Sequence, residues 1–392
     1  MKIAVLVSGG VDSSVALRLL KDQGHDLTAF YLKIWLEDEL SFLGDCPWEE
    51  DLKYVQAVCK LVDVPLQVVN LQEEYHNKVV SYAISEVSAG RTPSPDLFCN
   101  KLIKFGCFLE KFGDQFDKVA TGHYAQTQEI NVPFIKLKNP LKWFDRLTTN
   151  GFYKPFALSL SKGLSERFQK KFNGKFLLRK AVDPIKDQTY FLSHLDQNQL
   201  SKILFPIGNL QKSQVRELAQ KYDLPNKDRK DSQGICFLGK IKFSDFIKHH
   251  LGIKKGDLVE FETGKKVGEH EGFWYYTLGQ RKGIRLSGGP WFVVKKDTQK
   301  NIVYISNKYF TPEKKRDILT VSSFNWISGQ KPENKNLQVK IRHGEQIYNC
   351  TLDFNYDDSA VVKLDKQDQG LAPGQFAVFY DGDICLGCGV IC

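Results

Sequence analysis

The feature that most constrains this chain is a loop of serines and glycines between a strand and a helix near its start. Ile3–Val7 is a run of apolar residues typical of a buried parallel strand, and Val15–Leu20 has the pattern of a helix. The loop between them, Ser8–Ser14, reads Ser-Gly-Gly-Val-Asp-Ser-Ser. A loop in this position directs backbone N–H groups and the positive end of a helix toward one point, which favours phosphate binding.

The side chains of this loop indicate which phosphate compound is used. The hydroxyls of Ser8, Ser13 and Ser14 are candidate hydrogen-bond donors to phosphate. Asp12 is a candidate ligand of a Mg²⁺ ion that accompanies the phosphates. No Gly-Lys-Ser/Thr follows, so this is not the common P-loop, in which a lysine reaches the phosphates. The loop instead resembles the signature of ATP pyrophosphatases, which cleave ATP between the α and β phosphates and adenylate a substrate. We therefore expect ATP with Mg²⁺ to be used.

The first half of the chain alternates strand and helix. Strands are predicted at Leu27–Leu32, Leu66–Leu71 and Lys118–His123, and helices at Glu50–Leu61 and Tyr75–Gly90. This order predicts an α/β fold with a doubly wound parallel sheet, whose ligands lie at the carboxyl ends of the strands. Gly122 is expected at that edge, near the nucleotide.

The remainder divides into three stretches. The stretch from Gln126 to Asp183 is irregular, and we expect an insertion near 132–182 that is largely loop. Helical patterns follow at Leu200–Leu204 and Ser213–Tyr222. From Gly256 onward, short strands broken by Gly, Asn, Asp and Pro predict a C-terminal β-barrel. These strands are Asp257–Glu262, Gly272–Leu278, Trp291–Lys296, Ile302–Ser306, Leu337–Arg342, Tyr348–Phe354, Ser359–Leu364 and Phe376–Tyr380. The predicted domains are 1–205 (ATP pyrophosphatase), 206–290 (small mixed domain) and 291–392 (barrel).

Composition sets the class of protein and its compartment. The 392 residues include 55 Lys and Arg against 46 Asp and Glu, a net charge of +9 that permits an RNA partner without requiring one. No apolar run approaches the ~20 residues that span a bilayer. Nine cysteines in irregular positions indicate reduced thiols. We expect a cytoplasmic protein without a signal peptide, or an organelle matrix protein if a presequence was removed.

Two cysteines lie in contexts that suggest chemistry. Cys99 follows Pro93 and Pro95, which predict an extended loop, and the nearby Lys101 and Lys104 would favour its thiolate. Asp96 is placed to accept or donate a proton. Cys236 ends a polar stretch, 230–234, and is followed by apolar residues. Each cysteine could equally be a small buried apolar side chain, and spacing alone does not bring the two together.

The whole chain resembles the tRNA-specific 2-thiouridylases, which are ATP pyrophosphatases that thiolate the wobble uridine. The matching motifs are Ser8–Ser14, Gly90–Phe105, Ala120–Ala125, Lys186–Leu192, Asp231–Phe237, Tyr276–Gly283 and Ala372–Gln375. The resemblance implies ATP contacts at Leu6, Val7, Ser8, Gly9, Gly10, Val11, Asp12, Ser13, Leu32 (where the family commonly has Met) and Gly122. It also implies tRNA contacts at Ser94, Pro95, Asp96, Lys186, Asp187, Gln188, Arg342 and His343, with Ser94 and Pro95 beside the target base.

The same resemblance implies the catalytic residues and partners. Cys99 would be the first catalytic cysteine, Cys236 the carrier of a persulfide sulfur, and Asp96 the acid/base residue. Adenylation turns the uridine C2 oxygen into a leaving group, sulfur from Cys236 replaces it, and a Cys99–Cys236 disulfide remains for external reduction. The expected partners are the anticodon loop of tRNA and a cysteine desulfurase or sulfur-relay protein. We expect no association with a membrane, and we expect the chain to be a monomer.

The sequence is also compatible with two other functions. Another ATP pyrophosphatase that adenylates a small acid or nucleotide would not need Cys99 and Cys236. An iron–sulfur or thiol-ligated metal protein that binds tRNA would use both cysteines, with Asp96, as ligands. Cys385, Cys388 and Cys392 end the chain, but no second pair or histidine cluster lies nearby in sequence, and we expect no metal site there.

Overall fold

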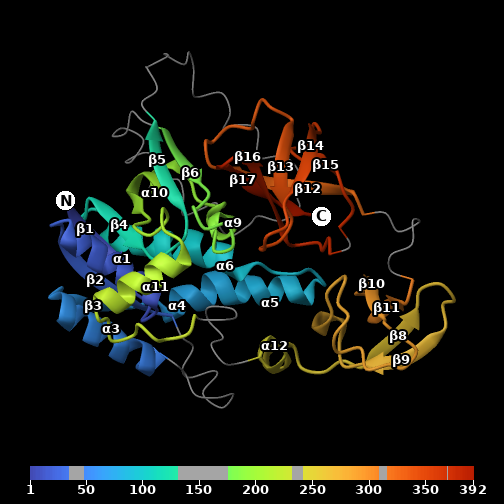
Figure 1. The fold of residues 1–392 in the computed structure, drawn as a ribbon. Coiled ribbons are helices and arrows are strands. Elements are labelled where there is room, and N and C mark those ends of the chain that lie inside the picture. The colour runs from blue at the N-terminus through green and yellow to red at the C-terminus, as the bar shows by residue number, and fades with distance from the viewer. Residues whose placement is uncertain (35–47, 131–174, 232–241, 309–315, 369) are drawn as a thin grey trace.

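The computed structural model describes residues 1–34, 48–130, 175–231, 242–308, 316–368 and 370–392, and the strands within these ranges form three sheets (Figure 1). The N-terminal sheet has the order β3-β2-β1-β4-β7, and all its neighbouring strands are parallel. Its strands are β1 (Lys2–Leu6), β2 (Asp26–Lys33), β3 (Leu66–Asn70), β4 (Lys118–Thr121) and β7 (Ile203–Leu204). The predicted parallel α/β sheet is confirmed.

Helices cover both faces of this sheet because the side chains of β1 alternate in direction. Ile3 packs in a core with α1 (Val11–Asp22) and α3 (Trp48–Val62). Ala4 packs in the opposite core with α7 (Phe108–Phe112). The other helices are α4 (Gln72–Tyr75), α5 (Ser81–Ser88), α6 (Pro95–Phe98), α9 (Thr189–Leu192), α10 (Gln197–Lys202), α11 (Lys212–Lys221) and α12 (Phe243–Leu251), with π-helical segments at His76–Val80 and Cys99–Cys107 and a 3₁₀ turn at Phe273–Tyr275.

The second half contains a small sheet and a barrel. The small sheet has the order β10-β11-β8-β9, in which β11 and β8 are parallel. The barrel strands run β12-β15-β14-β13-β16-β17, and a further pairing of β12 with β17 closes the ring. The bounds are β8 (Gly256–Glu260), β9 (Lys266–His270), β10 (Phe292–Asp297), β11 (Ile302–Ser306), β12 (Ile318–Trp326), β13 (Asn336–Lys340), β14 (Tyr348–Phe354), β15 (Ala360–Leu364), β16 (Phe376–Asp381) and β17 (Ile384–Ile391). The predicted C-terminal barrel is confirmed, but the strands predicted at 257–262, 291–296 and 302–306 belong to the separate small sheet and not to the barrel. The domain boundaries at 205 and 290 stay predictions.

Three local predictions differ from the structure. Gln126–Ile130 and Lys175–Arg179, expected within an irregular stretch, form the antiparallel strands β5 and β6, which extend the barrel sheet from β17 (Figure 1). Most of the insertion predicted at 132–182 lies outside the described residues. Gly272–Leu278 is not a strand, because Gly272 has φ +149° and the 3₁₀ turn follows it. The helix predicted at Leu200–Leu204 ends at Lys202, and β7 follows it to pair with β4.

A buried ion pair joins the barrel to the N-terminal half. Lys340 Nζ, at the end of β13, lies 3.5 Å from Asp187 Oδ2, and the two side chains are only 7% and 2% exposed. Thr189 Oγ1 lies 3.1 Å from the Tyr380 hydroxyl, which comes from the neighbouring strand β16. Charges this deeply buried are tolerated only when they are paired and hydrogen-bonded, so the pair fixes how the barrel docks.

Replacing Lys340 with Ala is expected to lower the free energy of unfolding by about 3 kcal/mol or more, because Asp187 would then be a buried charge without its cation. The measurement is urea unfolding followed by circular dichroism. The matched control is Lys335→Ala, since the Lys335–Asp353 pair precedes the same strand but is 60% and 65% exposed. The control should lose no more than about 1 kcal/mol. Equal losses in both variants would contradict the role given to the buried pair.

Candidate active site

The loop between β1 and α1 is held in shape by its own serines. Ser13 Oγ accepts a hydrogen bond from the Ser8 amide at 3.2 Å and donates to the Gly10 carbonyl at 3.1 Å. Ser14 Oγ donates to the same carbonyl at 3.0 Å. Ser13 and Ser14 are buried, so these hydroxyls shape the loop, and the backbone N–H groups at the start of α1 provide the anion-binding character.

Two glycines permit close approaches around this loop. Gly9 has φ +79°, and a Cβ there would lie 2.7 Å from the Asp51 carbonyl oxygen. Gly122 follows β4, and a Cβ there would lie 2.5 Å from the Ser13 amide nitrogen. Both distances are shorter than real Cβ contacts, so any side chain would push these segments apart. The structure thus brings Gly122 against the loop, at the predicted edge of the sheet, and Leu32 lies at the carboxyl end of the adjacent strand β2.

Asp12 is the acidic side chain at this loop, and it has two partners that are distant in the sequence. Lys212 Nζ lies 2.7 and 2.9 Å from its two carboxylate oxygens, and the Tyr124 hydroxyl donates to it at 3.0 Å. Burial and the neighbouring Asp12 charge raise the pKa of Tyr124, so its hydroxyl remains a donor. A carboxylate beside a phosphate-binding loop suits Mg²⁺, which usually combines one or two carboxylates with phosphate and water oxygens. Among the described residues, no group of three His, Cys, Asp or Glu side chains is placed to hold a metal alone.

Cys99 lies in a helical and apolar environment. Pro95 begins α6, and Cys99 is the first residue of the π-helical segment that continues it, so the extended loop predicted for Cys99 is wrong. The side chain is 1% exposed, in a core that includes Phe246 of α12. Burial, with a smaller contribution from the charge of Asp96, raises the pKa of the Cys99 thiol to about 11 although Lys104 opposes this.

Burial thus outweighs Lys104, whose charge does lower the pKa of the Cys99 thiol as expected, so the thiol is protonated at pH 7 in this conformation. Lys101 points elsewhere, since its Nζ lies 2.8 Å from Asp196 Oδ2. Ser94 immediately precedes α6, and its amide donates to the Tyr82 hydroxyl at 3.3 Å. Ser94, Pro95 and Asp96 thus lie five, four and three residues before Cys99, at the start of the same helical stretch. Cys236 lies outside the described residues.

The two segments predicted to contact tRNA lie side by side. The ring of His343 lies 4.4 Å from that of Phe191, which follows the 186–188 segment, and the charge of Asp96 also acts on His343. Burial and the neighbouring Lys340 lower the pKa of His343, so its ring is neutral at pH 7. Arg342 is 42% exposed and makes a two-pronged contact with Asp368, at 2.8 and 2.5 Å. The 94–96 segment and the two tRNA-motif segments therefore share one region.

Within 186–188 the three side chains differ. Lys186 Nζ lies 2.8 Å from Asp231 Oδ2 and is 37% exposed. Asp187 is buried and accepts hydrogen bonds from the Ala181 amide and the Thr189 hydroxyl, at 3.0 and 2.7 Å. Gln188 Oε1 accepts a hydrogen bond from the Tyr124 amide at 2.9 Å. Lys186 and Gln188 are thus partly exposed while Asp187 is buried, and both Asp187 and Gln188 accept hydrogen bonds from neighbouring backbone.

Known proteins match this chain along its full length. Family models match at 1–240 (tRNA methyl transferase HUP domain), 244–307 (tRNA methyl transferase PRC-barrel domain) and 316–391 (Aminomethyltransferase beta-barrel domain). The tRNA-specific 2-thiouridylase MnmA of Parabacteroides distasonis is 43% identical over 397 residues, covering 100% of this chain and 99% of that protein. The Porphyromonas gingivalis protein of that name is 42% identical, with 100% and 99% covered. The chain belongs to the MnmA family of tRNA-specific 2-thiouridylases. An NMN synthetase structure from Francisella tularensis matches with a TM-score of 0.31 and 16% identity, covering 64% of this chain and 76% of that one.

Several residues of this MnmA-family site were missed in the sequence. Asn226 Nδ2 donates to the Gly9 carbonyl at 2.8 Å and to Ser14 Oγ at 2.9 Å, and Arg229 donates to the same carbonyl at 3.0 Å. Lys212 contacts Asp12, which lies 200 positions earlier in the sequence. No spacing rule links residues some 200 positions apart, so only the packed structure brings them to the loop.

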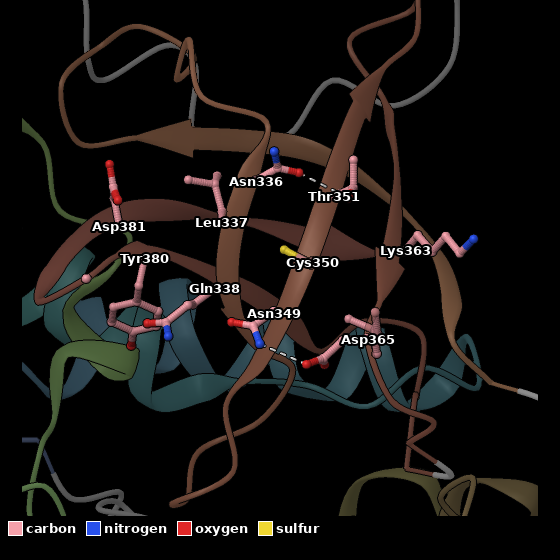
Figure 2. Close-up of a pocket in the computed structure, with 12 residues that line it drawn as sticks. Asn336, Leu337, Gln338, Asn349, Cys350, Thr351, Lys363, Asp365, Tyr380 and Asp381 are labelled. Carbon is pink, nitrogen blue, oxygen red and sulfur yellow. Dashed lines mark hydrogen bonds between the residues drawn. The ribbon is translucent and has the colours of Figure 1, made fainter.

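A pocket on the barrel lies away from the predicted MnmA-family site residues. Figure 2 shows it between side chains of β13, β14 and β15, where Asn349 donates to Asp365 at 2.9 Å. Tyr380 also lines the pocket, and its hydroxyl contacts Thr189. None of the predicted catalytic, ATP-binding or tRNA-binding residues lines it. Cys385 and Cys388 are buried in β17 in the same core as Leu97 and Tyr190, and Cys392 is exposed.

In this conformation Cys99 should react slowly with iodoacetamide at pH 7, because a thiol of pKa about 11 is ionised to only about 1 part in 10⁴ there. Its rate should rise through pH 9, measured by peptide mass spectrometry. Cys392, which is exposed, is the internal control and should be modified first. Modification of Cys99 as fast as Cys392 at pH 7 would contradict the buried thiol.

Proposed function

We propose that this chain is a tRNA-uridine 2-sulfurtransferase, which adenylates the C2 oxygen of the wobble uridine with ATP and replaces it with sulfur. The observation that carries this proposal is the full-length identity of 43% to proteins named tRNA-specific 2-thiouridylase. The geometry is consistent with it, since a loop of ATP pyrophosphatase type lies at the sheet edge and the segments at 94–99, 186–191 and 342–343 share one region.

Each predicted site residue has a proposed role. Backbone groups of the loop from Leu6 to Ser13, with Gly122 and Leu32 beside it, hold ATP, and Asp12 serves the Mg²⁺ that accompanies the phosphates. Ser94 and Pro95 lie beside the target base, and Asp96 exchanges protons with it. Lys186, Arg342 and His343 contact the RNA, together with Asp187 and Gln188 as positioning residues.

The sulfur is proposed to arrive as a persulfide on Cys236. The C2 oxygen of the uridine attacks the α phosphorus of ATP, and pyrophosphate leaves with the electron pair of the broken P–O bond. The terminal sulfur of the persulfide then forms a bond to C2. The Cys99 thiolate attacks the Cys236 sulfur, the S–S bond to the transferred atom breaks, and AMP departs with the former C2 oxygen. The Cys99–Cys236 disulfide that remains is reduced by an external thiol.

This route defines the proposed partners and the decisive experiment. A cysteine desulfurase or a sulfur-relay protein supplies the persulfide, and a monomer in the cytoplasm or in an organelle matrix acts on tRNA. Among the described residues no helix is long and apolar enough to cross a membrane. The test is mass spectrometry of the wobble nucleoside after incubation with tRNA, ATP and a persulfide donor, which should reveal 2-thiouridine. The absence of 2-thiouridine in a preparation that binds tRNA and ATP would overturn the proposal.

Single cysteine variants should accumulate different species. With Cys236→Ala, adenylated tRNA should form while no persulfide is loaded at that position. With Cys99→Ala, Cys236 should still be loaded, but transfer should stall at a protein persulfide or an enzyme–tRNA adduct. Alkylation followed by intact-mass measurement distinguishes these states.

The matched control is Cys392→Ala, an exposed cysteine outside the proposed chemistry, which should thiolate as the parent does. If either catalytic-cysteine variant thiolated at the parent rate, the two-cysteine mechanism would be wrong. If both variants instead lost bound iron and sulfide together, the cysteines would be cluster ligands.

Arg342→Ala should weaken tRNA binding and reduce the slope of log affinity against log salt concentration by about one unit or less, since one phosphate contact is lost. ATP affinity should change little. The measurement is a tRNA binding titration at several salt concentrations, with Lys335→Ala as a control for an exposed barrel cation. An unchanged salt slope would assign Arg342 to its ion pair with Asp368 alone.

A further inference from the structure

Lys212 brings two carboxylates from distant parts of the chain onto one ammonium group. Its Nζ lies 2.7 Å from Asp12 Oδ1, in the nucleotide loop, and 2.8 Å from Asp231 Oδ1. Asp231 immediately precedes 232–241, the stretch that includes Cys236. The Lys212 side chain is only 16% exposed. This ammonium therefore lies at the meeting point of the nucleotide loop and the start of the Cys236 segment.

The position of Lys212 is fixed by its backbone and by helix packing. Lys212 is the first residue of α11, and its amide donates to Asp183 Oδ2 at 2.9 Å. The helix packs against α1 through an apolar core that includes Val215 and Val15. Because α1 also carries Asp12, the ammonium is held at a set distance from the loop. An ordinary surface ion pair has no such support.

The charges around Lys212 leave it available for an anion. Asp231 also contacts Lys186 at 2.8 Å and Arg216 at 2.5 Å. Burial alone would raise the pKa of Asp231, but Lys186 and Lys212 hold it well below the usual range. Among the described residues of this cluster, the cations Lys186, Lys212 and Arg216 contact the carboxylates of Asp12 and Asp231. A third carboxylate, that of Asp183, accepts the Lys212 amide. Asp231 would thus keep two cationic partners if Lys212 turned toward a phosphate. The ammonium also lies beside the amino-terminal end of α1, which itself favours anions.

We propose that Lys212 is a phosphate-binding residue of this chain and contacts the pyrophosphate portion of ATP. The loop itself has no lysine, in contrast to a P-loop, and Lys212 supplies that charge from a helix 200 residues away. Asp12 positions the ammonium, and Asp231 links it to the start of the segment with Cys236. The inference rests on the proposed use of ATP, and extends it to a residue and a chemical group that the loop motif does not include.

The test compares nucleotides that differ in their phosphates. Lys212→Ala and Lys212→Gln should weaken binding of ATP and of pyrophosphate by about tenfold or more, the effect of losing one charge-assisted hydrogen bond. Binding of AMP, and of tRNA, should change less than about twofold. Calorimetric titration of the full chain with Mg²⁺ present measures each affinity. Lys221→Ala is the matched control, since Lys221 is the exposed last residue of the same helix.

Two results would overturn the inference. Unchanged ATP affinity in both variants would exclude Lys212 from the phosphate site. Equal losses for ATP and AMP, with a lowered unfolding midpoint, would show that Lys212 only supports the fold.

A measurement on the unsubstituted protein tests the proposal even if the Lys212 variants do not fold. Amine labelling of Lys212, resolved by peptide mass spectrometry, should fall when a non-hydrolysable ATP analogue is added, but not with AMP, while labelling of Lys221 stays constant. Unchanged labelling of Lys212 would reject the proposal. Failure of the proposed function is separable: a parent protein that forms no 2-thiouridine, yet binds ATP through Lys212, would overturn the function and retain this inference.

Discussion

The buried contact between Asp187 and Lys340 determines how the halves of this protein meet. Asp187 belongs to the 186–188 segment and Lys340 ends the barrel strand that leads to Arg342, so one ion pair aligns both segments predicted to contact RNA. The Phe191–His343 ring contact at 4.4 Å continues the same interface. A buried carboxylate is strongly destabilising without its cation, so the docking of the barrel and the placement of the 186–188 and 342–343 segments depend on one another. This explains why a buried residue occurs within a segment that resembles an RNA-contact motif.

At the other end of the same segment, a series of ion pairs connects Lys186 to the loop between β1 and α1. Lys186 contacts Asp231, Asp231 shares Lys212 with Asp12, and Asp12 lies in the nucleotide loop. The chain of contacts is short and only partly exposed, which reduces screening by salt. An enzyme that joins ATP to an RNA base has to hold the two substrates in a fixed geometry relative to each other. Positioning of this kind strongly lowers the activation barrier of the reaction.

The sequence predicted local features well and long-range contacts poorly. The loop at Ser8–Ser14 was identified because strand, loop and helix are consecutive, and the parallel sheet followed from alternating patterns. Lys212 and Asn226 were missed, since no periodicity connects them to a loop 200 residues earlier. The β5–β6 hairpin was missed because its strands are separated by 44 residues, and because β6 joins the barrel strand β17, which lies about 200 residues later in the sequence.

Cys99 shows why a charge count along the sequence is a poor guide to reactivity. Lys101 and Lys104 suggested a stabilised thiolate, but Lys101 is directed to Asp196 and burial dominates the thiol. Spacing along the sequence does not reveal which side chains surround a residue at the start of a helix. Here desolvation raises the pKa of the Cys99 thiol by more than Lys104, five residues away, lowers it. For the proposed attack on a persulfide, the apolar cover that includes Phe246 must give way to a more polar setting. The same cover raises the pKa of the Cys99 thiol and keeps it protonated at pH 7 in this conformation.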